Sequence, residues 1–242
     1  HWRNMETEDI QFKGKNDLVS FVDLQSEERL KNELLSLTPK AQFIAEESSQ
    51  EVRDLSNTWI IDPLDGTTNF LHGVPAFCIS VAYYRDDKAL MGFIYDPVHD
   101  EFFSANPEGA YLNELPIYTS KTNTLNDALV ATGFPYSLIG ELPLYLQILQ
   151  EIMSQTRAMR RLGSAALDLA YVACGRFDLF YEFGLSPWDV AAGKLIVEKA
   201  GGKVSAIGAN NNSLFDHEIL ASNHFIFENA FEIISQKLTK NL

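Results

Sequence analysis

The chain has 242 residues, of which 46% are apolar, and its formal net charge at pH 7 is −14. This length and apolar content are enough for a sizeable core in one domain or in two tightly joined subdomains. The negative charge argues against a nucleic-acid surface and against binding to anionic membranes, and no apolar run approaches the length that spans a bilayer.

The beginning of the chain and its cysteines bear on processing and location. The sequence starts at His1 with a polar run to Gln11 that shows no capped helix and no cleavable signal pattern, so we expect that a preceding segment is missing. Cys78 and Cys174 each lie in apolar sequence, which predicts two buried free thiols rather than a disulfide. This cysteine usage fits a reducing cytoplasm.

The first half of the chain predicts one helix and then a largely antiparallel sheet. Ser26 has the character of an N-cap, acidic residues and helically spaced leucines follow it, and Pro39 ends the helix after Thr38. Charged or proline-containing turns separate the runs with strand character. The predicted strands are Gln42–Ala45, Thr58–Ile61, Phe77–Tyr84, Leu90–Tyr95 and Glu101–Ala105.

The second half predicts alternating strands and helices. A polar stretch at Thr119–Asn126 separates the two patterns, so we place a boundary between subdomains 1–123 and 124–242. Strands followed by alternating elements indicate a layered α+β or α/β fold. The predicted elements are a strand at Ala128–Thr132, helices at Tyr145–Ser154 and Ser164–Cys174, a strand at Leu179–Glu182 and a helix at Pro187–Ala200.

The most informative stretch is the sequence of residues 59–69, WIIDPLDGTTN. We expect a buried strand to end at Ile61, because Pro63 lacks a backbone donor and stops the ladder. Asp62 and Asp65 would then converge on a hard cation, with the carbonyl of Leu64 as a further oxygen ligand. Amides from Gly66 onward can cradle an anion, although the same residues also suit an ordinary turn.

Two further acidic elements strengthen the cation-site interpretation. Glu46 and Glu47 close a predicted strand just before the Asp62 strand, and Glu46 in particular can complete the site or hold an attacking water. Asp189 falls in the first turn of a helix capped by Ser186, where the helix dipole favours its ionised form. Taken alone, the glutamates would be a solvated turn and Asp189 a helix-stabilising acid.

Residues near the start of another predicted helix are candidates for substrate contact. We predict Ser164 first as a helix cap, and the backbone amides around it offer a second role in ligand binding. Glu182 ends a strand and can reach a substrate hydroxyl, although a lone glutamate there is usually solvated. The five histidines show no zinc-ligand spacing, and no Gly-x-Ser-x-Gly motif marks a serine nucleophile.

Together these motifs resemble the inositol monophosphatase family of magnesium-dependent, lithium-sensitive phosphatases. The similarity rests on residues 62–69 (DPLDGTTN), 46–47 (EE) and 188–193 (WDVAAG), in the order in which the family has them. It extends to residues 13–20 (KGKNDLVS), to residues 163–166 (GSAA) and to Glu182. Ser20 and Ser164 stand where the family often has Thr, so substrate preference can differ.

The resemblance implies an α-β-α-β-α sandwich, a homodimer, and a site that holds two or three Mg²⁺ ions or Mn²⁺. It implies direct in-line attack of activated water on phosphorus, without a covalent intermediate. Asp23 would pair with the Thr67 hydroxyl and help to deprotonate the water. The implied metal ligands are Glu46, Asp62, the Leu64 carbonyl, Asp65 and Asp189, and the implied substrate contacts are Asp65, Gly66, Thr67, Gly163, Ser164, Ala165 and Glu182.

The expected function is therefore that of a phosphoric monoester hydrolase of the inositol-1-phosphatase type, acting on a small phosphorylated substrate. Nucleotide 3′-phosphates, histidinol phosphate, NADP and fructose bisphosphate are alternative substrates, because loops around the leaving group decide specificity. An aspartyl-phosphate phosphatase of the haloacid-dehalogenase type is an alternative hypothesis from a different enzyme class. In that class, however, the two aspartates are two positions apart, whereas Asp62 and Asp65 are three positions apart. A non-catalytic regulatory or partner-binding module is the other alternative.

Overall fold

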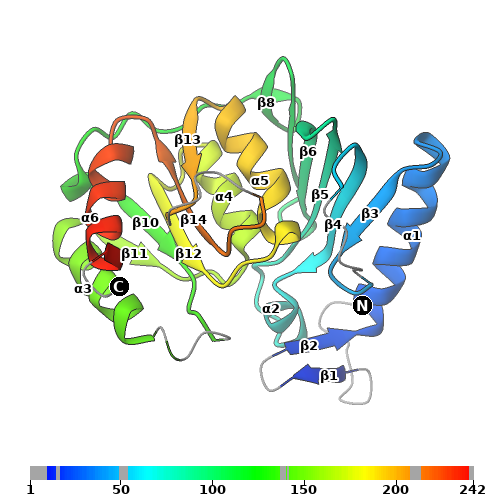
Figure 1. Cartoon of the computed structure of the whole chain (residues 1–242), viewed down its shortest axis with the longest axis horizontal. Coiled ribbons are helices and arrows are strands. Elements are labelled where there is room, and N and C mark those ends of the chain that lie inside the picture. Colours follow the sequence, from blue (N-terminus) through cyan, green and yellow to red (C-terminus); the bar gives the residue numbers. More distant parts are fainter. Residues whose placement is uncertain are drawn as a thin grey trace.

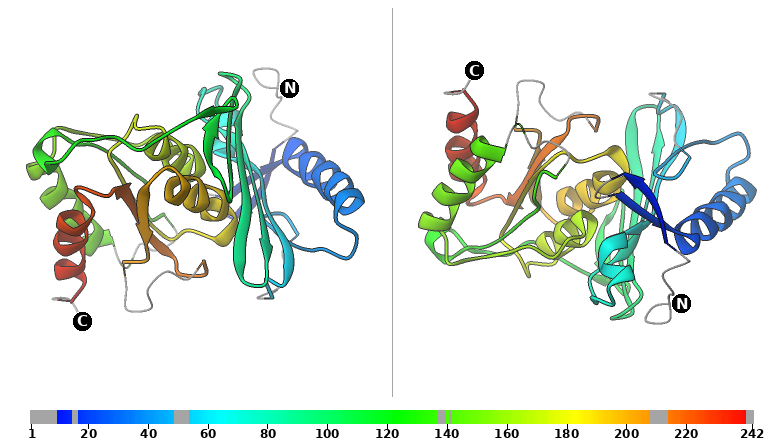
Figure 2. Two further views of the ribbon diagram at one scale, coloured as in Figure 1. Left: turned by 90° about the horizontal axis from the view of Figure 1, so that it is seen from above. Right: turned by 90° about the horizontal axis from the view of Figure 1, so that it is seen from below.

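Five alternating layers of helix and sheet make up the fold of the computed structural model (Figures 1 and 2). The structure describes residues 10–14, 17–48, 54–136, 140, 142–207 and 214–239, and only the backbone of residues 10–20 and 239. The layering is the α-β-α-β-α arrangement that the family resemblance implies. The helices are α1 (Phe21–Leu37), α2 (Thr67–Leu71), α3 (Leu142–Gln155), α4 (Ala165–Ala173), α5 (Pro187–Lys199) and α6 (Phe227–Thr239), with a short 3-10 helix, η2, at Leu125–Asp127.

The larger sheet has seven strands in the order β3-β4-β5-β6-β7-β8-β9. The pair β3 and β4 is parallel and the other pairs are antiparallel, which confirms the predicted largely antiparallel sheet. Its strands are β3 (Gln42–Ala45), β4 (Asn57–Asp65), β5 (Cys78–Arg85), β6 (Lys88–Asp96), β7 (Glu101–Asn106), β8 (Gly109–Leu112) and β9 (Leu115–Pro116), and a separate hairpin is formed by β1 (Ile10–Gly14) and β2 (Asp17–Ser20).

The alternation of side chains along β4 places this sheet between two helical layers. Trp59 and Ile61 point to one face, where they pack with Leu30 and Leu34 of α1. Ile60, between them in sequence, points to the other face and joins the main core. A period of two divides the apolar residues of a strand between the two faces, so a strand buried on both sides reads as a continuous apolar run.

The structure corrects the predicted start of the first helix. Helix α1 begins at Phe21, directly after β2, and not after a cap at Ser26. The Ser26 hydroxyl instead donates a hydrogen bond to the carbonyl oxygen of Pro63 at 3.2 Å and so links α1 to β4. A serine inside a helix can satisfy its hydroxyl through a tertiary contact, which sequence spacing alone does not reveal. The predicted end before Pro39 is confirmed.

The structure also corrects the predicted end of the second strand. Strand β4 continues through both carboxylates to Asp65, with a shift in register between Asp62 and Asp65. Asp62 is paired with Ser80, and Asp65 is paired with Cys78. Pro63 falls within this irregular stretch, where the ladder does not require its missing N–H. The irregularity lets two acids three positions apart face one site.

The smaller sheet has five strands in the order β11-β10-β12-β14-β13. Helices α4 and α5 lie between the two sheets. Helices α3 and α6 form the outer layer on the other face of the smaller sheet (Figures 1 and 2). The sequence analysis did not predict β1, β2, η2, β8, β9, β11, β13, β14 or α6. The strands of the smaller sheet are β10 (Leu129–Thr132), β11 (Ala158–Arg160), β12 (Leu179–Phe183), β13 (Gly202–Ser205) and β14 (Glu218–Asn223).

The chain changes from one sheet to the other between Pro116 and Leu129. The boundary near residue 123 stays a prediction, because α5 of the second half packs on β4 to β8 of the first. In the described part of the chain, the helices all fall short of the length and apolarity that crossing a lipid bilayer demands. The polar run at the start of the chain includes residues 1–9, which lie outside the described ranges.

Candidate active site

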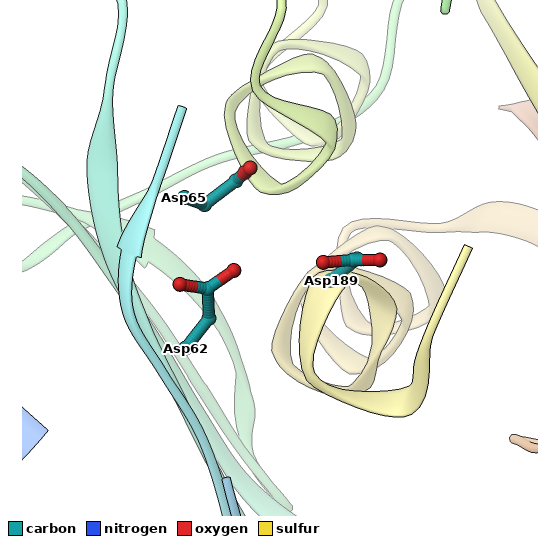
Figure 3. A group of neighbouring side chains, drawn as sticks. All are labelled: Asp62, Asp65 and Asp189. Carbon is teal, nitrogen blue, oxygen red and sulfur yellow. The ribbon is translucent and has the colours of Figure 1, made fainter. Parts of the chain in front are cut away.

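Three carboxylates converge where β4 faces the start of helix α5. Asp62, Asp65 and Asp189 each place an oxygen within 4.8 Å of the others (Figure 3). Asp62 and Asp65 are only 2% and 9% exposed. Carboxylate oxygens gathered at this spacing are the ligands that Mg²⁺ and other hard cations prefer. We refer to these three residues as the aspartate triad.

The local fold orients each member of the triad. Asp62 Oδ1 accepts a hydrogen bond from the amide of Leu64 at 2.9 Å. Asp189 Oδ2 accepts one from the amide of Ser186 at 2.7 Å, as the reciprocal half of a capping box at the start of α5. Ser186 as cap and Pro187 as first helical residue are as the sequence predicts. The capping role therefore coexists with the position of Asp189 in the triad.

Asp65 also holds the start of helix α4. Its Oδ2 accepts hydrogen bonds from the Ser164 hydroxyl at 2.6 Å and from the amide of Ala166 at 2.7 Å. Ser164 is the N-cap of α4, and its hydroxyl oxygen accepts from the amide of Leu167 at 3.3 Å. The amides at this helix start thus meet a protein carboxylate, which complements the positive end of the helix dipole.

The mutual repulsion of the three buried carboxylates favours binding of a cation. Burial raises the pKa of Asp62 well above its usual range, and the charges of Glu46, Asp65 and Asp189 raise it further. Burial likewise raises the pKa of Asp65, against the hydrogen bonds from α4, and that of Asp189, where the charge of Asp65 adds to the effect. Closely spaced acids in a poorly hydrated site repel one another unless a cation neutralises them. The donor set therefore fits a hard divalent ion.

Glu46 lies beside the triad because β3 and β4 are parallel and end at the same edge of the sheet. Ala45 is paired with Ile61, and the amide of Glu46 donates to the carbonyl of Ile61 at 3.3 Å. The effect of Glu46 on the pKa of Asp62 agrees with this placement. The sequence reading therefore placed Glu46 correctly next to the Asp62 strand, and its role as a ligand stays a prediction.

The hydroxyl of Thr67 sits between a carboxylate and a carbonyl. It lies 3.0 Å from Asp23 Oδ1 and 3.0 Å from the carbonyl oxygen of Leu64, so it can donate to either acceptor. Asp23 is fully buried in the first turn of α1. Thr67 opens α2, which follows Gly66 at a φ of 92°. The pair expected from the resemblance is thus within hydrogen-bonding distance at the edge of the triad.

Glu182 lies on β12, close enough to Asp65 for the two charges to interact. Burial raises its pKa to about 8, the charge of Arg161 lowers it and that of Asp65 raises it.

Asp168 is a buried acid near the site that the sequence analysis did not identify. It is 1% exposed, and burial and the charges of Glu182 and Asp65 raise its pKa. Its position four residues after Ser164, on the same face of α4, is the signal that could have found it.

Cys78 is the other buried neighbour that the sequence reading did not assign to the site. It is fully buried, and its sulfur lies 3.9 Å from Asp65 Oδ2 and 3.5 Å from the Ser164 hydroxyl. Burial raises the pKa of this thiol well above its usual range, so the thiol stays protonated. Cys78 and Cys174 are both free, as predicted, but only Cys78 is buried; Cys174 is partly exposed.

Comparison with known proteins identifies the family to which this site belongs. A family model described as the inositol monophosphatase family matches residues 2–239. The chain belongs to the inositol monophosphatase family. It is therefore a phosphoric monoester hydrolase, and the haloacid-dehalogenase interpretation is wrong.

The chain is 38% identical to an inositol-1-monophosphatase of Mesorhizobium japonicum over 232 residues, which cover 95% of this chain and 87% of that protein. It is 40% identical to the Nus factor SuhB of Escherichia coli over 226 residues, which cover 91% of this chain and 85% of that protein. The extragenic suppressor protein suhB of Bartonella henselae has a solved structure that matches with a TM-score of 0.88 and 40% identity, covering 94% of this chain and 88% of that one.

The family depends on magnesium. A solved structure of an IMPase/NADP phosphatase complexed with Mg²⁺ and phosphate matches this inositol monophosphatase-family chain at a TM-score of 0.83 and 25% identity. The match covers 93% of this chain and 86% of that one. A divalent cation is thus consistent both with the family and with the aspartate triad.

Proposed function

We propose that this chain hydrolyses inositol 1-phosphate or a closely related phosphomonoester, with Mg²⁺ held by the aspartate triad and Glu46. The observation that carries the proposal is the convergence of Asp62, Asp65 and Asp189 from β4 and α5 on one point. The similarity to a protein named inositol-1-monophosphatase supports the substrate. The carbonyl of Leu64 is a further candidate ligand, and the ion number of two or three and the use of Mn²⁺ rest on the resemblance.

When bound, the cations would lower the pKa of a nearby water and neutralise charge on the transferred phosphoryl group. The residues of the chain supply the other parts of the reaction. In this proposal the amides of Gly66 and Thr67, at the start of α2, hold the phosphate oxygens. The Thr67 hydroxyl, within 3.0 Å of Asp23, can accept a proton from the attacking water as it passes its own proton to that carboxylate.

Residues on the α4 side would orient the alcohol portion of the substrate. Gly163, Ser164 and Ala165 border the triad through the hydrogen bond between Ser164 and Asp65. Glu182 faces the same side from β12 and can bind a substrate hydroxyl. Because none of these groups is a nucleophile in this scheme, we expect no covalent phosphoenzyme.

The test is phosphate release from a panel of phosphomonoesters by the purified chain. With Mg²⁺, we expect turnover of inositol 1-phosphate, and excess chelator should abolish it. The panel also contains a nucleotide 3′-phosphate, histidinol phosphate, NADP and fructose 1,6-bisphosphate. Turnover undiminished by chelator would refute the metal-dependent mechanism, and turnover of another member alone would replace the proposed substrate.

A second candidate function is partner binding, which the similarity to proteins named Nus factor SuhB favours. If the chain bound a cation but hydrolysed no member of the panel, this function would replace catalysis.

From the resemblance we also propose a homodimer, which sedimentation equilibrium would test by mass. The free cysteines support a reducing cytoplasm as the location.

A further inference from the structure

Asn69 ends the acidic motif at residues 62–69, and its side chain has no part in the chemistry proposed above. Its Nδ2 donates to the carbonyl oxygen of Ala76 at 2.6 Å and to that of Leu162 at 2.8 Å. The carbonyl oxygen of Gly163 lies farther away, at 3.4 Å. A side-chain amide carries two N–H groups and can therefore bridge two acceptors. Asn69 thus joins α2 to the segment that precedes α4.

This bridge closes a ring of contacts around the site. From Asp65 the backbone runs through Gly66 into α2 and reaches Asn69. The amide of Asn69 then meets the carbonyl of Leu162, and the chain continues to Ser164, the cap of α4. The Ser164 hydroxyl donates back to Asp65 Oδ2 at 2.6 Å. The ring therefore links the start of α2, the start of α4 and one member of the triad.

Close backbone approach on both sides fixes the position of the bridging amide. A Cβ on Gly163 would lie 3.0 Å from Nδ2 of Asn69. A Cβ on Gly66 would lie 2.9 Å from the carbonyl oxygen of Ala76, the same oxygen that accepts from Asn69. Without the amide, both carbonyl oxygens would lose this donor, and the repulsion between their dipoles would favour a wider separation of the two segments.

We propose that Asn69 is a positioning residue that fixes the distance between the phosphate side of the site and its alcohol side. The inference rests on the proposed function, in which the start of α2 holds the phosphate and residues 163–165 with Glu182 orient the alcohol. Two anchor points at a fixed separation favour a substrate whose hydroxyl groups lie at the matching distance from its phosphate. Asn69 therefore determines specificity for a polyol phosphate without contacting the substrate itself.

The experiment compares kcat/KM for inositol 1-phosphate with kcat/KM for 4-nitrophenyl phosphate, which offers no hydroxyl group to the alcohol side. In Asn69→Ala, the ratio of the two values should fall about tenfold, because a hydrogen bond to a substrate hydroxyl is misaligned. Asn69→Asp keeps the shape but turns an oxygen toward both carbonyls, so the ratio should fall at least as far. Its added charge acts on the phosphate of both compounds and cancels in the ratio.

Asn106→Ala is the matched control. Asn106 is also partly buried and also bonds the backbone, but its Oδ1 accepts from the amides of Glu108 and Gly109, at 2.8 Å and 3.2 Å, within its own turn. The ratio in Asn106→Ala should therefore equal that of the wild type. A comparable fall of the ratio in this control would overturn the inference.

The other outcomes separate a positioning role from a role in stability. An equal loss for both compounds in Asn69→Ala would show a role in stability alone and overturn the inference. A wild-type ratio in Asn69→Asp would overturn it as well, because the donor would then be dispensable.

Hydrogen exchange followed by mass spectrometry keeps this test independent of the proposed function. If the wild type left inositol 1-phosphate intact, the proposed function would fail, and the exchange rates would decide the inference in that case or if 4-nitrophenyl phosphate were not hydrolysed. Faster exchange in Asn69→Ala confined to residues 66–70 and 163–167 supports the inference. Unchanged exchange in either segment, or an equal rise throughout the chain, refutes it.

Discussion

Single residues in this site serve folding and chemistry at once. Asp189 caps helix α5 through the amide of Ser186 and also faces the triad. Asp65 accepts hydrogen bonds from the start of α4 while it faces Asp62. A carboxylate at a helix start is stabilised by the dipole, so these folding contacts also hold the charges in a fixed position for a cation.

We predict that Asp189→Asn lowers kcat by about 100-fold or more, because one ligand charge that neutralises the transition state is lost. The amide oxygen can still cap α5, so cooperative unfolding should be retained. Steady-state kinetics at saturating Mg²⁺ and thermal melting would measure both. Asp127→Asn is the control, since Asp127 is an exposed acid in a first turn that accepts from Thr124 at 2.9 Å. Near wild-type turnover in Asp189→Asn would exclude Asp189 as a ligand.

The position of the Thr67 hydroxyl predicts a kinetic effect different from that of Asp189→Asn. Thr67→Ala removes the group that bridges Asp23 and the Leu64 carbonyl, and it should lower kcat while KM changes little. Thr67→Ser should restore most of the turnover because it keeps the hydroxyl. Thr68→Ala, at the exposed neighbouring position, should match the wild type. A higher KM at constant kcat in Thr67→Ala would assign the hydroxyl to substrate binding instead.

At the scale of elements, the site depends on how β4 turns into α2. Gly66 caps α2 at a φ of +92°, and a Cβ there would lie 2.9 Å from the carbonyl oxygen of Ala76. A side chain at this position therefore meets both left-handed strain and a backbone clash. The close approach of the chain after β4 therefore requires glycine at position 66.

We predict that Gly66→Ala lowers the free energy of unfolding by about 1–3 kcal/mol more than Gly73→Ala does. Gly73 also has a positive φ, of +70°, but a Cβ there would meet nothing within 4 Å, so it isolates the cost of backbone strain. Urea unfolding of both variants would measure the difference. Equal destabilisation would mean that Ala76 moves aside and that the close approach costs little.

At the scale of the molecule, the site lies where the two sheets and the helices between them meet. Asp62 and Asp65 come from the seven-stranded sheet, whereas Asp189 comes from the middle helical layer (Figure 3). The contact of Asp65 with α4 joins the same layers. Burial of the repelling acids at this junction costs stability until a cation binds.

This cost predicts a pH-dependent stabilisation by Mg²⁺. The folded pKa values of Asp62, Asp65 and Asp189 are raised, so the folded protein binds more protons than the unfolded chain, and its metal-free stability falls as pH rises through those values. The rise in melting temperature on adding Mg²⁺ should therefore be larger at about pH 8 than at about pH 6, where protons compete with the cation.

Differential scanning fluorimetry with and without Mg²⁺ would measure this rise at each pH. Asp189→Asn should show a smaller rise at the higher pH, because it carries one repelling charge fewer. The Asp127→Asn control should behave as the wild type. The same rise at every pH would contradict the assignment of the triad as the cation site.

Much of this arrangement could be predicted from the sequence because it is local. Turn and cap chemistry at residues 62–69 and 186–189 depends on neighbours within a few positions, so both acidic motifs and the cap of α5 could be recognised. The apolar run ending at Ile61 predicted a buried strand because a strand covered on both faces needs apolar residues throughout. The order of the motifs was enough to indicate the family.

Only the tertiary structure decided the features that depend on distant partners. Helix α1 begins at Phe21 because packing extends it beyond the cap expected at Ser26, and β4 continues past Pro63 because β5 pairs with an irregular ladder. Arg161 lies over the rings of Phe134 and Tyr136 because β11 and the loop after β10 bring these distant segments together. Contacts between segments far apart in sequence leave no periodic pattern, and so spacing alone could not reveal them.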